Sequence, residues 1–537
     1  MLKSLGCLAA GASLAVAFPE NAEPHVAWFA FVPLLIILRF STPGQGFLYG
    51  FLHGIGFWLL SISWLMELRN NGGPVMLVLI GLTGLSIWCS LFSAVFGYSV
   101  SLLWQGGDSA TAGWKRYFFE TWRPPVIALI WCGGEYLRST LFTGFAWNAV
   151  GVSQVSYLPI VQLASLGGVY AVSFLVLLVN GALAGVCVRL WRNTMLREPN
   201  STRRHFDLMT ALLVLFVAIY WGRKRISELQ ASGQSSERLS VVAIDPDLPC
   251  IFSINESENI KIAYSNLYEK TDALSLNADL VVWPETSLPS CMPDKVLEKN
   301  MLRFASQIGA PILAGTTEFS LNNKNEEECR NSTFLFGTNG VIESVYSKQH
   351  LVPFGEFLPF DKKMKFLQKL APTGVSCTPG EGAVVMEVNG IKVSPLICFE
   401  DTVASLSRAA VKAGAQILIA QSNDSWFYGS SEAVQHHAQA IFRAVENAVP
   451  LVRCSNRGIT AFVSPYGGSQ EFLLHTIPVY SGAGSTLYSR FGDWIFGIPC
   501  AVIFIGVCIF RFWNKIFCKS DSKSYSKKEG DTSSVPS

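Results

Sequence analysis

Long apolar stretches fill the first 225 residues of the chain, and one more follows near its C-terminal end. A helix that spans a bilayer needs about 20 residues. The fourth and sixth stretches are long enough, whereas the second, fifth and seventh are short and need flanking residues to reach across. We therefore expect a multi-pass α-helical membrane domain at residues 1–225, with seven helices, and one further helix at residues 494–513. The seven stretches are Leu2–Phe18, Val26–Phe40, Phe47–Leu65, Val75–Trp104, Val126–Leu137, Ile160–Leu190 and Leu208–Trp221.

The pattern changes between residues 238 and 485, where short apolar runs alternate with amphipathic segments. Such alternation is typical of an α/β domain. The expected strands are Leu239–Ile244, Leu280–Trp283, Pro311–Gly315, Ser332–Phe336, Val384–Val388, Val393–Ile397, Ile417–Ala420, Leu451–Arg453 and Thr460–Ser464. The expected helices are Ile260–Ser275, Asp294–Ile308, Val403–Ala413 and Glu432–Glu446.

The composition supports a membrane location, because 50% of the residues are hydrophobic and only 15% are charged. A soluble domain usually has about a quarter charged residues. The net charge of +2 gives no reason to expect a nucleic-acid partner. The 13 cysteines include no CxxC pair, which argues against zinc. The sequence leaves open whether disulfides form among Cys250, Cys291, Cys329 and Cys377.

Basic residues predict the orientation of the bundle. They gather between the fourth and fifth stretches and between the sixth and seventh, and the positive-inside rule places such loops in the cytoplasm. The N-terminus is then cytoplasmic, and residues 238–485 lie outside. Arg223, Lys224 and Arg225 oppose this scheme, although long domains translocate largely regardless of charge. The lysine-rich tail at 514–537 is expected to be disordered and cytoplasmic.

Three residues are candidates for chemistry. Cys398 follows the apolar run Val393–Ile397, and a thiol at a strand end is a candidate nucleophile. A buried structural cysteine is an equally good interpretation of Cys398 alone. Glu285 follows a strand and a proline, where a solvated turn glutamate is the alternative. Lys348 lies in an aromatic loop, which could instead be a membrane contact.

Together these stretches resemble the nitrilase (carbon–nitrogen hydrolase) superfamily. Glu285 after Trp-Pro, Lys348 in Tyr-x-Lys-x-His-Leu-Val-Pro-Phe-Gly-Glu, and Cys398 before Phe-Glu are similar to its Glu–Lys–Cys triad. With helices on both sides of the α/β domain, the chain resembles the apolipoprotein N-acyltransferase family over nearly its whole length. Matching motifs include Thr143-Gly144-Phe145-Ala146-Trp147, Asn423-Asp424-Ser425-Trp426-Phe427, Gln435-His436-His437 and Arg453-Cys454-Ser455-Asn456-Arg457-Gly458.

The resemblance implies an α-β-β-α sandwich and a two-step acyl transfer without metal or organic cofactor. Cys398 would take an acyl chain from a phospholipid as a thioester and pass it to the amine of a diacylglyceryl-cysteine apolipoprotein. Glu285 would act as general base and Lys348 as oxyanion stabiliser, with the Phe399 backbone N–H as a second candidate donor. Glu356 would either orient Lys348 or hold the base side of the site, and Glu400 would support the local loop. The enzyme would be a monomer in the bacterial inner membrane, with its catalytic domain on the periplasmic side.

Two other functions compete with this one. A membrane-anchored nitrilase-type amidase would use water in place of the lipoprotein amine. A non-catalytic transporter with an external domain is disfavoured, because the apolar stretches carry few charges apart from Glu135. Departures from the family pattern are Asp245-Pro246-Asp247 in place of Gln-Gly-Asn, Ile254 in place of Trp, and Phe399 in place of Tyr. They bear on lipid binding rather than on the triad.

Overall fold

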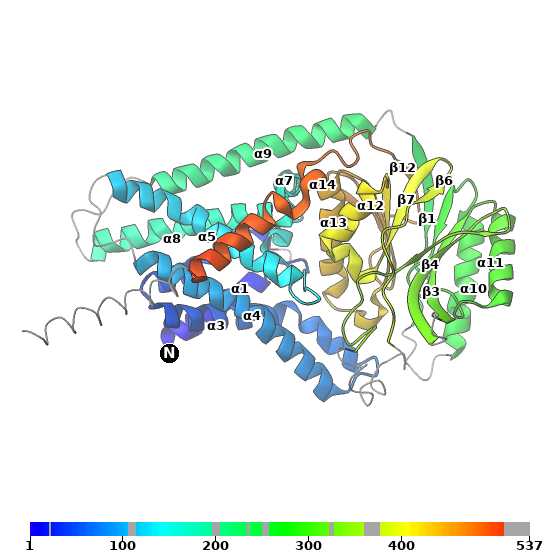
Figure 1. Cartoon of the computed structure of the whole chain (residues 1–537), viewed down its shortest axis with the longest axis horizontal. Coiled ribbons are helices and arrows are strands. Elements are labelled where there is room, and N and C mark those ends of the chain that lie inside the picture. Colours follow the sequence, from blue (N-terminus) through cyan, green and yellow to red (C-terminus); the bar gives the residue numbers. More distant parts are fainter. Residues whose placement is uncertain are drawn as a thin grey trace, which may run out of the picture.

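The structure is a computed structural model, and it describes residues 1–20, 23–105, 114–195, 205–233, 237–249, 257–321, 327–358 and 376–509. Helices gather at one end of the molecule and two β-sheets at the other (Figure 1). The helix α13, Glu432–Asn447, lies where the two parts meet. Three features named in the sequence lie outside the described residues: Cys250, the departure at Ile254 and the tail at 514–537.

The helical part contains nine α-helices and several short 3₁₀ segments among the described residues before 234. They are α1 (Leu2–Ala15), α2 (Val32–Arg39), α3 (Pro43–Ser61), α4 (Val75–Gln105), α5 (Trp114–Thr140), α6 (Leu158–Val161), α7 (Ala164–Gly167), α8 (Val169–Met195) and α9 (Phe206–Ser232). Pro24–Trp28, Ser63–Arg69 and Val150–Gln154 form 3₁₀ turns between them.

Several expected helices are interrupted. The stretch Val26–Phe40 divides into a 3₁₀ turn and α2, and Ile160–Leu190 divides into α6, α7 and α8. Gly168, with φ of +69°, separates α7 from α8, because glycine adopts this left-handed conformation without a Cβ clash. A single helix over either stretch is therefore wrong.

Within the described residues, four helical segments are long and apolar enough to cross a membrane, and α3 with the following 3₁₀ turn makes a fifth if that bent pair is one span. The four are Val75–Trp104, Val169–Met195, Phe206–Ser232 and Leu487–Ile509. The last of these includes α14 (Leu487–Phe491) and returns along the bundle (Figure 1). The count of seven helices plus one, and the domain boundaries at residues 225 and 238, stay predictions.

Glycines let the membrane helices approach closely. A Cβ at Gly50 of α3 would collide with the Ser93 carbonyl of α4, and a Cβ at Gly97 would collide with the Gly46 carbonyl. Small residues at helix contacts are the usual means of close packing in a membrane, where hydrophobic burial between helices contributes little. The bundle is thus held by backbone-to-backbone contact at this pair.

Among the residues that the structure describes, the α/β part consists of two six-stranded sheets. One has the order β12-β1-β2-β3-β4-β5 and the other β11-β10-β9-β8-β7-β6. The first contains β1 (Arg238–Ala243), β2 (Leu280–Val282), β3 (Ile312–Leu321), β4 (Glu327–Phe336), β5 (Ile342–Ser347) and β12 (Leu474–Pro478). The second contains β6 (Met386–Val388), β7 (Ile391–Ile397), β8 (Ile417–Asn423), β9 (Leu451–Asn456), β10 (Ala461–Val463) and β11 (Ser469–Glu471).

The sheets are covered on their outer faces by helices, as expected for an α-β-β-α sandwich. One apolar core lies between the sheets, with residues such as Val241 and Ile419 that are fully buried. A second core packs α10 (Ser257–Leu274) and α11 (Lys295–Ile308) on the first sheet. A third packs α12 (Ala404–Lys412) and α13 on the second sheet, facing the helical part (Figure 1). The sandwich and all four expected helices are confirmed.

Candidate active site

The three candidate residues stand at the ends of three strands, and the sandwich brings them together. Glu285 follows β2 and Lys348 follows β5, both from the first sheet, whereas Cys398 follows β7 of the second. Side chains at strand ends are fixed by the packed strand yet remain reachable through the following loop. Glu285 is 8% exposed and Lys348 is 1% exposed, so this site is almost dry.

The nucleophile candidate occupies a tight turn. Cys398 has φ of +52°, a left-handed conformation that is uncommon for a residue with a Cβ. It opens the 3₁₀ turn Cys398–Thr402, whose Glu400 carboxylate accepts hydrogen bonds from the backbone N–H of Ile397 at 2.8 Å and of His350 at 3.0 Å. The same carboxylate accepts from the Tyr346 hydroxyl at 2.8 Å. Glu400 therefore ties the end of β7 to the loop that carries Lys348.

Lys348 lies between two carboxylates. Its Nζ is 2.9 Å from Glu356 Oε1 and 3.6 Å from Glu285 Oε1. The amide of Asn331 on β4 donates to Glu285 Oε1 at 2.7 Å and to Glu356 Oε1 at 2.8 Å. The other Glu285 oxygen accepts from the Asn423 backbone N–H at 3.0 Å. Each oxygen of Glu285 thus has a donor that fixes its position.

Burial and neighbouring charges set the protonation of the triad. Burial raises the pKa of the Cys398 thiol to about 12, with Glu285 adding to the rise and Lys348 opposing it. Burial also raises the pKa of Glu285, against the effect of Lys348, and the Cys398 side chain forms a hydrogen bond with this carboxylate. Burial alone would lower the pKa of Lys348, but Glu356 and Glu285 outweigh it and hold the pKa well above its usual value. The resting site therefore pairs a neutral thiol and an ammonium with a carboxylate able to accept a proton.

The sequence gives no signal for the contacts that two residues, Asn331 and Asn423, make in this site. Asn331 is one polar residue within the β4 hairpin strand, and its position opposite two glutamates follows only from the pairing of β4 with β5. Asn423 belongs to a motif that matches the family pattern, but its backbone contact with Glu285 depends on the sheet-to-sheet packing. Both contacts with the Glu285 carboxylate can be recognised only when the fold is known.

A cluster of buried charges lies beside the nucleophile turn. Arg453 Nη2 is 3.0 Å from Asp424 Oδ2, and His436 Nε2 is 2.8 Å from Asp401 Oδ1. Burial by itself would lower the pKa of His436, but Asp401 outweighs this effect and raises it well above its usual value. Burial and Asp424 raise the pKa of Glu432 to about 7.

Part of this cluster has the geometry of a metal site, because ligand atoms of Asp424, Glu432 and His436 lie within 4.8 Å of one another. Arg453 Nη2, however, contacts both Asp424 and His436 Nδ1, the latter at 2.9 Å. The guanidinium supplies the positive charge that a metal ion would bring to these carboxylates. The donor set fits a charge network better than a cation site.

Aromatic rings connect the site to the helical part. Phe399, directly after the nucleophile, stacks on Trp147 with ring centroids 6.3 Å apart and on His350 at 5.6 Å. Phe145 stacks on Phe399 as well, at 6.3 Å. Trp147 precedes the 3₁₀ turn Val150–Gln154 of the helical part. The residue after the nucleophile therefore touches rings from both parts of the chain.

Gln435 of α13 reinforces this junction. Its side-chain oxygen accepts hydrogen bonds from Trp147 Nε1 at 2.8 Å, Asn148 Nδ2 at 2.9 Å and Trp64 Nε1 at 3.2 Å. All three donors belong to the helical part, and Gln435 is 4% exposed. A single buried amide oxygen thus holds two segments of the bundle against the helix that carries His436.

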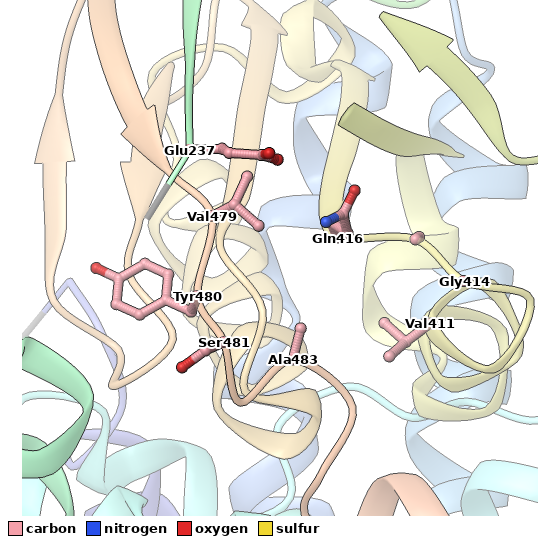
Figure 2. Close-up of a pocket in the computed structure, with 9 residues that line it drawn as sticks. Glu237, Val411, Gly414, Gln416, Val479, Tyr480, Ser481 and Ala483 are labelled. Carbon is pink, nitrogen blue, oxygen red and sulfur yellow. The ribbon is translucent and has the colours of Figure 1, made fainter. Parts of the chain in front are cut away.

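A pocket of about 520 Å³ lies elsewhere on the α/β part, beside the start of β8 and the segment after β12 (Figure 2). Glu237 and Gln416 project from opposite sides of it, with Val411 and Tyr480 among the other residues of its wall. It includes none of the three candidate residues. This hollow is therefore separate from the site at the strand ends.

Comparison with known proteins gives the family. Residues 10–182 match the model of the apolipoprotein N-acyltransferase N-terminal domain, and residues 237–470 match that of the carbon–nitrogen hydrolases. An apolipoprotein N-acyltransferase of Geobacter metallireducens is 31% identical over 500 residues, which cover 91% of either chain. The chain belongs to the apolipoprotein N-acyltransferase family. It is therefore an enzyme of the acyltransferase class and a membrane protein.

Other matches are more distant. The apolipoprotein N-acyltransferase 1 of Treponema denticola is 26% identical over 538 residues, covering 94% of either chain. Among solved structures, an amidase of the nitrilase superfamily from Nesterenkonia AN1 is 17% identical, with a TM-score of 0.34, and the match covers 48% of this chain and 94% of that one. The resemblance to the apolipoprotein N-acyltransferases noted in the sequence is confirmed, and so is the enzyme class.

Among the departures from the family pattern, Asp245, Asp247 and Phe399 lie in the described residues and make specific contacts. Asp245 Oδ1 accepts from the Arg457 backbone N–H at 3.1 Å, and Arg457 Nε donates to Asp247 Oδ1 at 2.7 Å. The acidic pair thus holds the loop after β9. Phe399, in place of tyrosine, offers a ring without a hydroxyl to the stack described above.

Proposed function

We propose that the protein transfers an acyl chain from a phospholipid to the N-terminal amine of diacylglyceryl-cysteine apolipoproteins, through a thioester on Cys398. Lipoprotein N-acylation in general follows from the family. The observation that carries the finer proposal is the convergence of Cys398, Glu285 and Lys348 in a nearly dry site. A nucleophile, a base and a fixed cation within contact are the parts that acyl transfer needs.

In the first step Cys398 would attack the phospholipid ester. Glu285 takes the thiol proton, because the thiol is neutral at rest and the carboxylate is its hydrogen-bond partner. The attack turns the ester carbonyl into an oxyanion, which Lys348 stabilises as a charge that is already in place. Glu285 then returns the proton to the leaving lysophospholipid alcohol. Atoms balance, with the acyl chain now a thioester of Cys398.

In the second step the free amine of the lipoprotein would attack that thioester. Glu285 accepts a proton from the attacking nitrogen, and Lys348 again stabilises the oxyanion. Collapse of the intermediate releases the Cys398 sulfur, which recovers a proton from Glu285. The product is an amide on the lipoprotein cysteine. Residues of one chain supply every role, which supports action as a monomer.

The supporting residues have separate tasks in this proposal. Glu356 and Asn331 hold the Lys348 ammonium and the Glu285 carboxylate in position through hydrogen bonds of 2.7 to 2.9 Å. Glu400 positions the Lys348 loop on the nucleophile strand. The Phe399 backbone N–H is the second candidate donor to the oxyanion.

The proposed location of the enzyme follows from where its two substrates lie. Both are anchored in lipid, so the site should face the outer leaflet of the bacterial inner membrane, with the α/β part in the periplasm. The half-buried ring of Phe399 against Trp147 and Phe145 supports entry of an acyl chain from the helical side. Phe354, 69% exposed beside the Lys348 loop, is suited to contact lipid.

The test uses the purified full-length chain in detergent with a phospholipid carrying labelled acyl chains and a synthetic diacylglyceryl-cysteine peptide. We expect labelled N-acyl peptide by mass spectrometry, and none from a matched peptide whose amine is acetylated. Release of labelled fatty acid at the same rate with either peptide would contradict the proposal and favour the amidase-type hydrolase, in which water replaces the amine.

A further inference from the structure

Two cysteines outside the triad face each other beside the site. Cys329 on β4 and Cys377 have sulfur atoms 3.1 Å apart, and their residues form an isolated parallel β-bridge. The Thr378 backbone N–H donates to the Cys329 carbonyl at 2.7 Å, so the backbones are held in register. Cys329 is fully buried and Cys377 is half-buried. Adjacent positions on paired extended segments are compatible with the separation that a disulfide requires.

This pair borders the segment that carries Lys348 and Glu356. The Cys377 backbone N–H donates to the Glu356 carbonyl at 2.8 Å, and the Gly380 N–H donates to the Lys348 carbonyl at 2.8 Å. Cys329 lies two residues before Asn331, and alternate residues of a strand share one face. The two sulfurs therefore join the strand of Asn331 to the backbone that supports Glu356.

The electrostatic state of the pair suits thiol–disulfide chemistry. The hydrogen bond from Cys377 lowers the pKa of the Cys329 thiol, and the same contact raises the pKa of Cys377. The two thiols thus share a hydrogen bond, and Cys329 is the one that loses its proton more readily. A thiolate, not a thiol, is the species that attacks a disulfide.

We propose that Cys329 and Cys377 form a disulfide that fastens the segment of Lys348 and Glu356 to β4. The inference rests on the proposed placement of the α/β part outside the cytoplasm, where disulfides form and persist. The bond closes a loop between positions 48 residues apart and so restricts a large part of the unfolded chain.

The oxidation needs an external disulfide, either that of a dithiol–disulfide oxidoreductase or glutathione disulfide. Cys377, the more accessible of the two sulfurs, enters a mixed disulfide and displaces one external thiolate, which takes up the Cys377 proton. The Cys329 thiolate then attacks the Cys377 sulfur and displaces the second external sulfur. Two protein thiols lose two electrons, the external disulfide gains them, and the two protons end on the external thiols.

The test starts from the full-length chain isolated from membranes, quenched in acid, denatured and alkylated without reductant. We expect the peptides of Cys329 and Cys377 to be linked and to separate on reduction, whereas Cys291, an exposed thiol nearby, should be alkylated. A second sample is first reduced and then treated with glutathione disulfide. If Cys329 and Cys377 remain alkylatable in both samples, the inference is overturned.

The two samples keep this inference apart from the proposed function. Linkage in the glutathione-treated sample alone would support the cysteine pair and contradict the external placement of the domain. Acyl-enzyme formation gives the functional readout: reduction, or Cys377→Ser, should lower its rate at least about tenfold, since small misplacements of reacting groups are costly. The matched control Cys291→Ser should leave the rate unchanged. An unchanged rate after proven reduction would show that the bond does not hold the site.

Discussion

Cys398 experiences two opposing charges, and their balance defines the site at the scale of single residues. Glu285 raises the pKa of the thiol and Lys348 lowers it, while burial raises it to about 12. A free thiol at that pKa is a poor nucleophile near neutral pH, because the thiolate is the reactive form. In the proposed mechanism, transfer of the thiol proton to Glu285 during the attack would remove this obstacle without a preformed thiolate.

Alkylation of Cys398 as a function of pH should separate the two partners. Lys348→Met removes the cation and should raise the apparent thiol pKa, whereas Glu285→Gln removes a negative charge and should lower it. Acyl transfer should fall in both, by about 10²–10³-fold for the loss of one oxyanion contact in Lys348→Met. An unchanged alkylation profile and an unchanged rate in Lys348→Met would remove Lys348 from the site.

Asn331 should matter for rate more than for folding. Asn331→Ala deletes the two hydrogen bonds from its amide to Glu285 and Glu356, so that of the side chains between these carboxylates only Lys348 still contacts both. We expect the rate of acyl-enzyme formation to fall about tenfold or more, because the positions of reacting groups loosen. The control Asn300→Ala, at an exposed helix position, should be neutral. Equal rates in the two variants would show that Asn331 has no role in positioning.

The sequence places Glu285 and Cys398 at strand ends and Lys348 in a loop, but it does not reveal the contacts of Asn331 and Gln435. Apolar runs before Glu285 and Cys398 mark the ends of β2 and β7 without reference to the rest of the chain. The contacts of Asn331 and Gln435 instead depend on which strand pairs with which and on how α13 meets the bundle. Such contacts between distant segments leave no periodic trace in the sequence.

At the scale of elements, strand ends carry the proposed catalytic residues, and a buried charge network contacts the turn after one of these strands. The turn Cys398–Thr402 contains Asp401, which contacts both His436 of α13 and Arg453 of β9. Three elements of the second sheet and its helix layer thereby share one set of charges. Removing one member leaves the others buried without a counter-charge, which costs far more than loss of a surface pair.

Arg453→Met should therefore destabilise the protein strongly. Asp401 and Asp424 lose their guanidinium partner while fully buried, and we expect a loss of about 3–5 kcal/mol in the free energy of unfolding. Arg457→Met removes an ion pair to the exposed Asp247 and should cost less than about 1 kcal/mol. Thermal unfolding in detergent compares the two. Similar midpoints for both variants would contradict the proposed cost of the buried network.

Element prediction from the sequence fails where burial is one-sided or partners are remote. The strands β5, β11 and β12 were not expected, because Ile342–Ser347 and Leu474–Pro478 mix exposed and buried residues and Ser469–Glu471 is fully exposed. β12 is defined by antiparallel pairing with β1, more than 230 residues away in the chain. Strongly amphipathic helices such as α11 and α13 are predictable, since their apolar face repeats locally.

At the scale of the whole molecule, the site lies close to the junction of the two parts. The stack of Phe399 on Trp147 and the hydrogen bonds to Gln435 make the nucleophile turn a neighbour of the helical bundle. A soluble enzyme of this chemistry would not need a contact between the turn after Cys398 and a helical bundle. A substrate held in lipid, by contrast, needs a path from the bundle to the thiol.

The orientation in the membrane can be checked with reporters. An enzyme active only outside the cytoplasm, inserted near Ser232 at the end of α9, should be active, because the basic loops place this end outside. The same reporter fused after Ser537 should be inactive. Equal activity at the two sites would contradict the arrangement of seven helices plus one.

The central claim is that Cys398 carries the acyl chain, and the mass of the protein tests it most directly. Purified chain incubated with phospholipid, without lipoprotein, should gain the mass of one acyl chain on the peptide that contains Cys398, and hydroxylamine should remove it. Cys187→Ala, at an exposed cysteine of α8, should gain the same mass. Cys398→Ala should gain none. Acylation that persists in Cys398→Ala would place the nucleophile elsewhere and contradict the account.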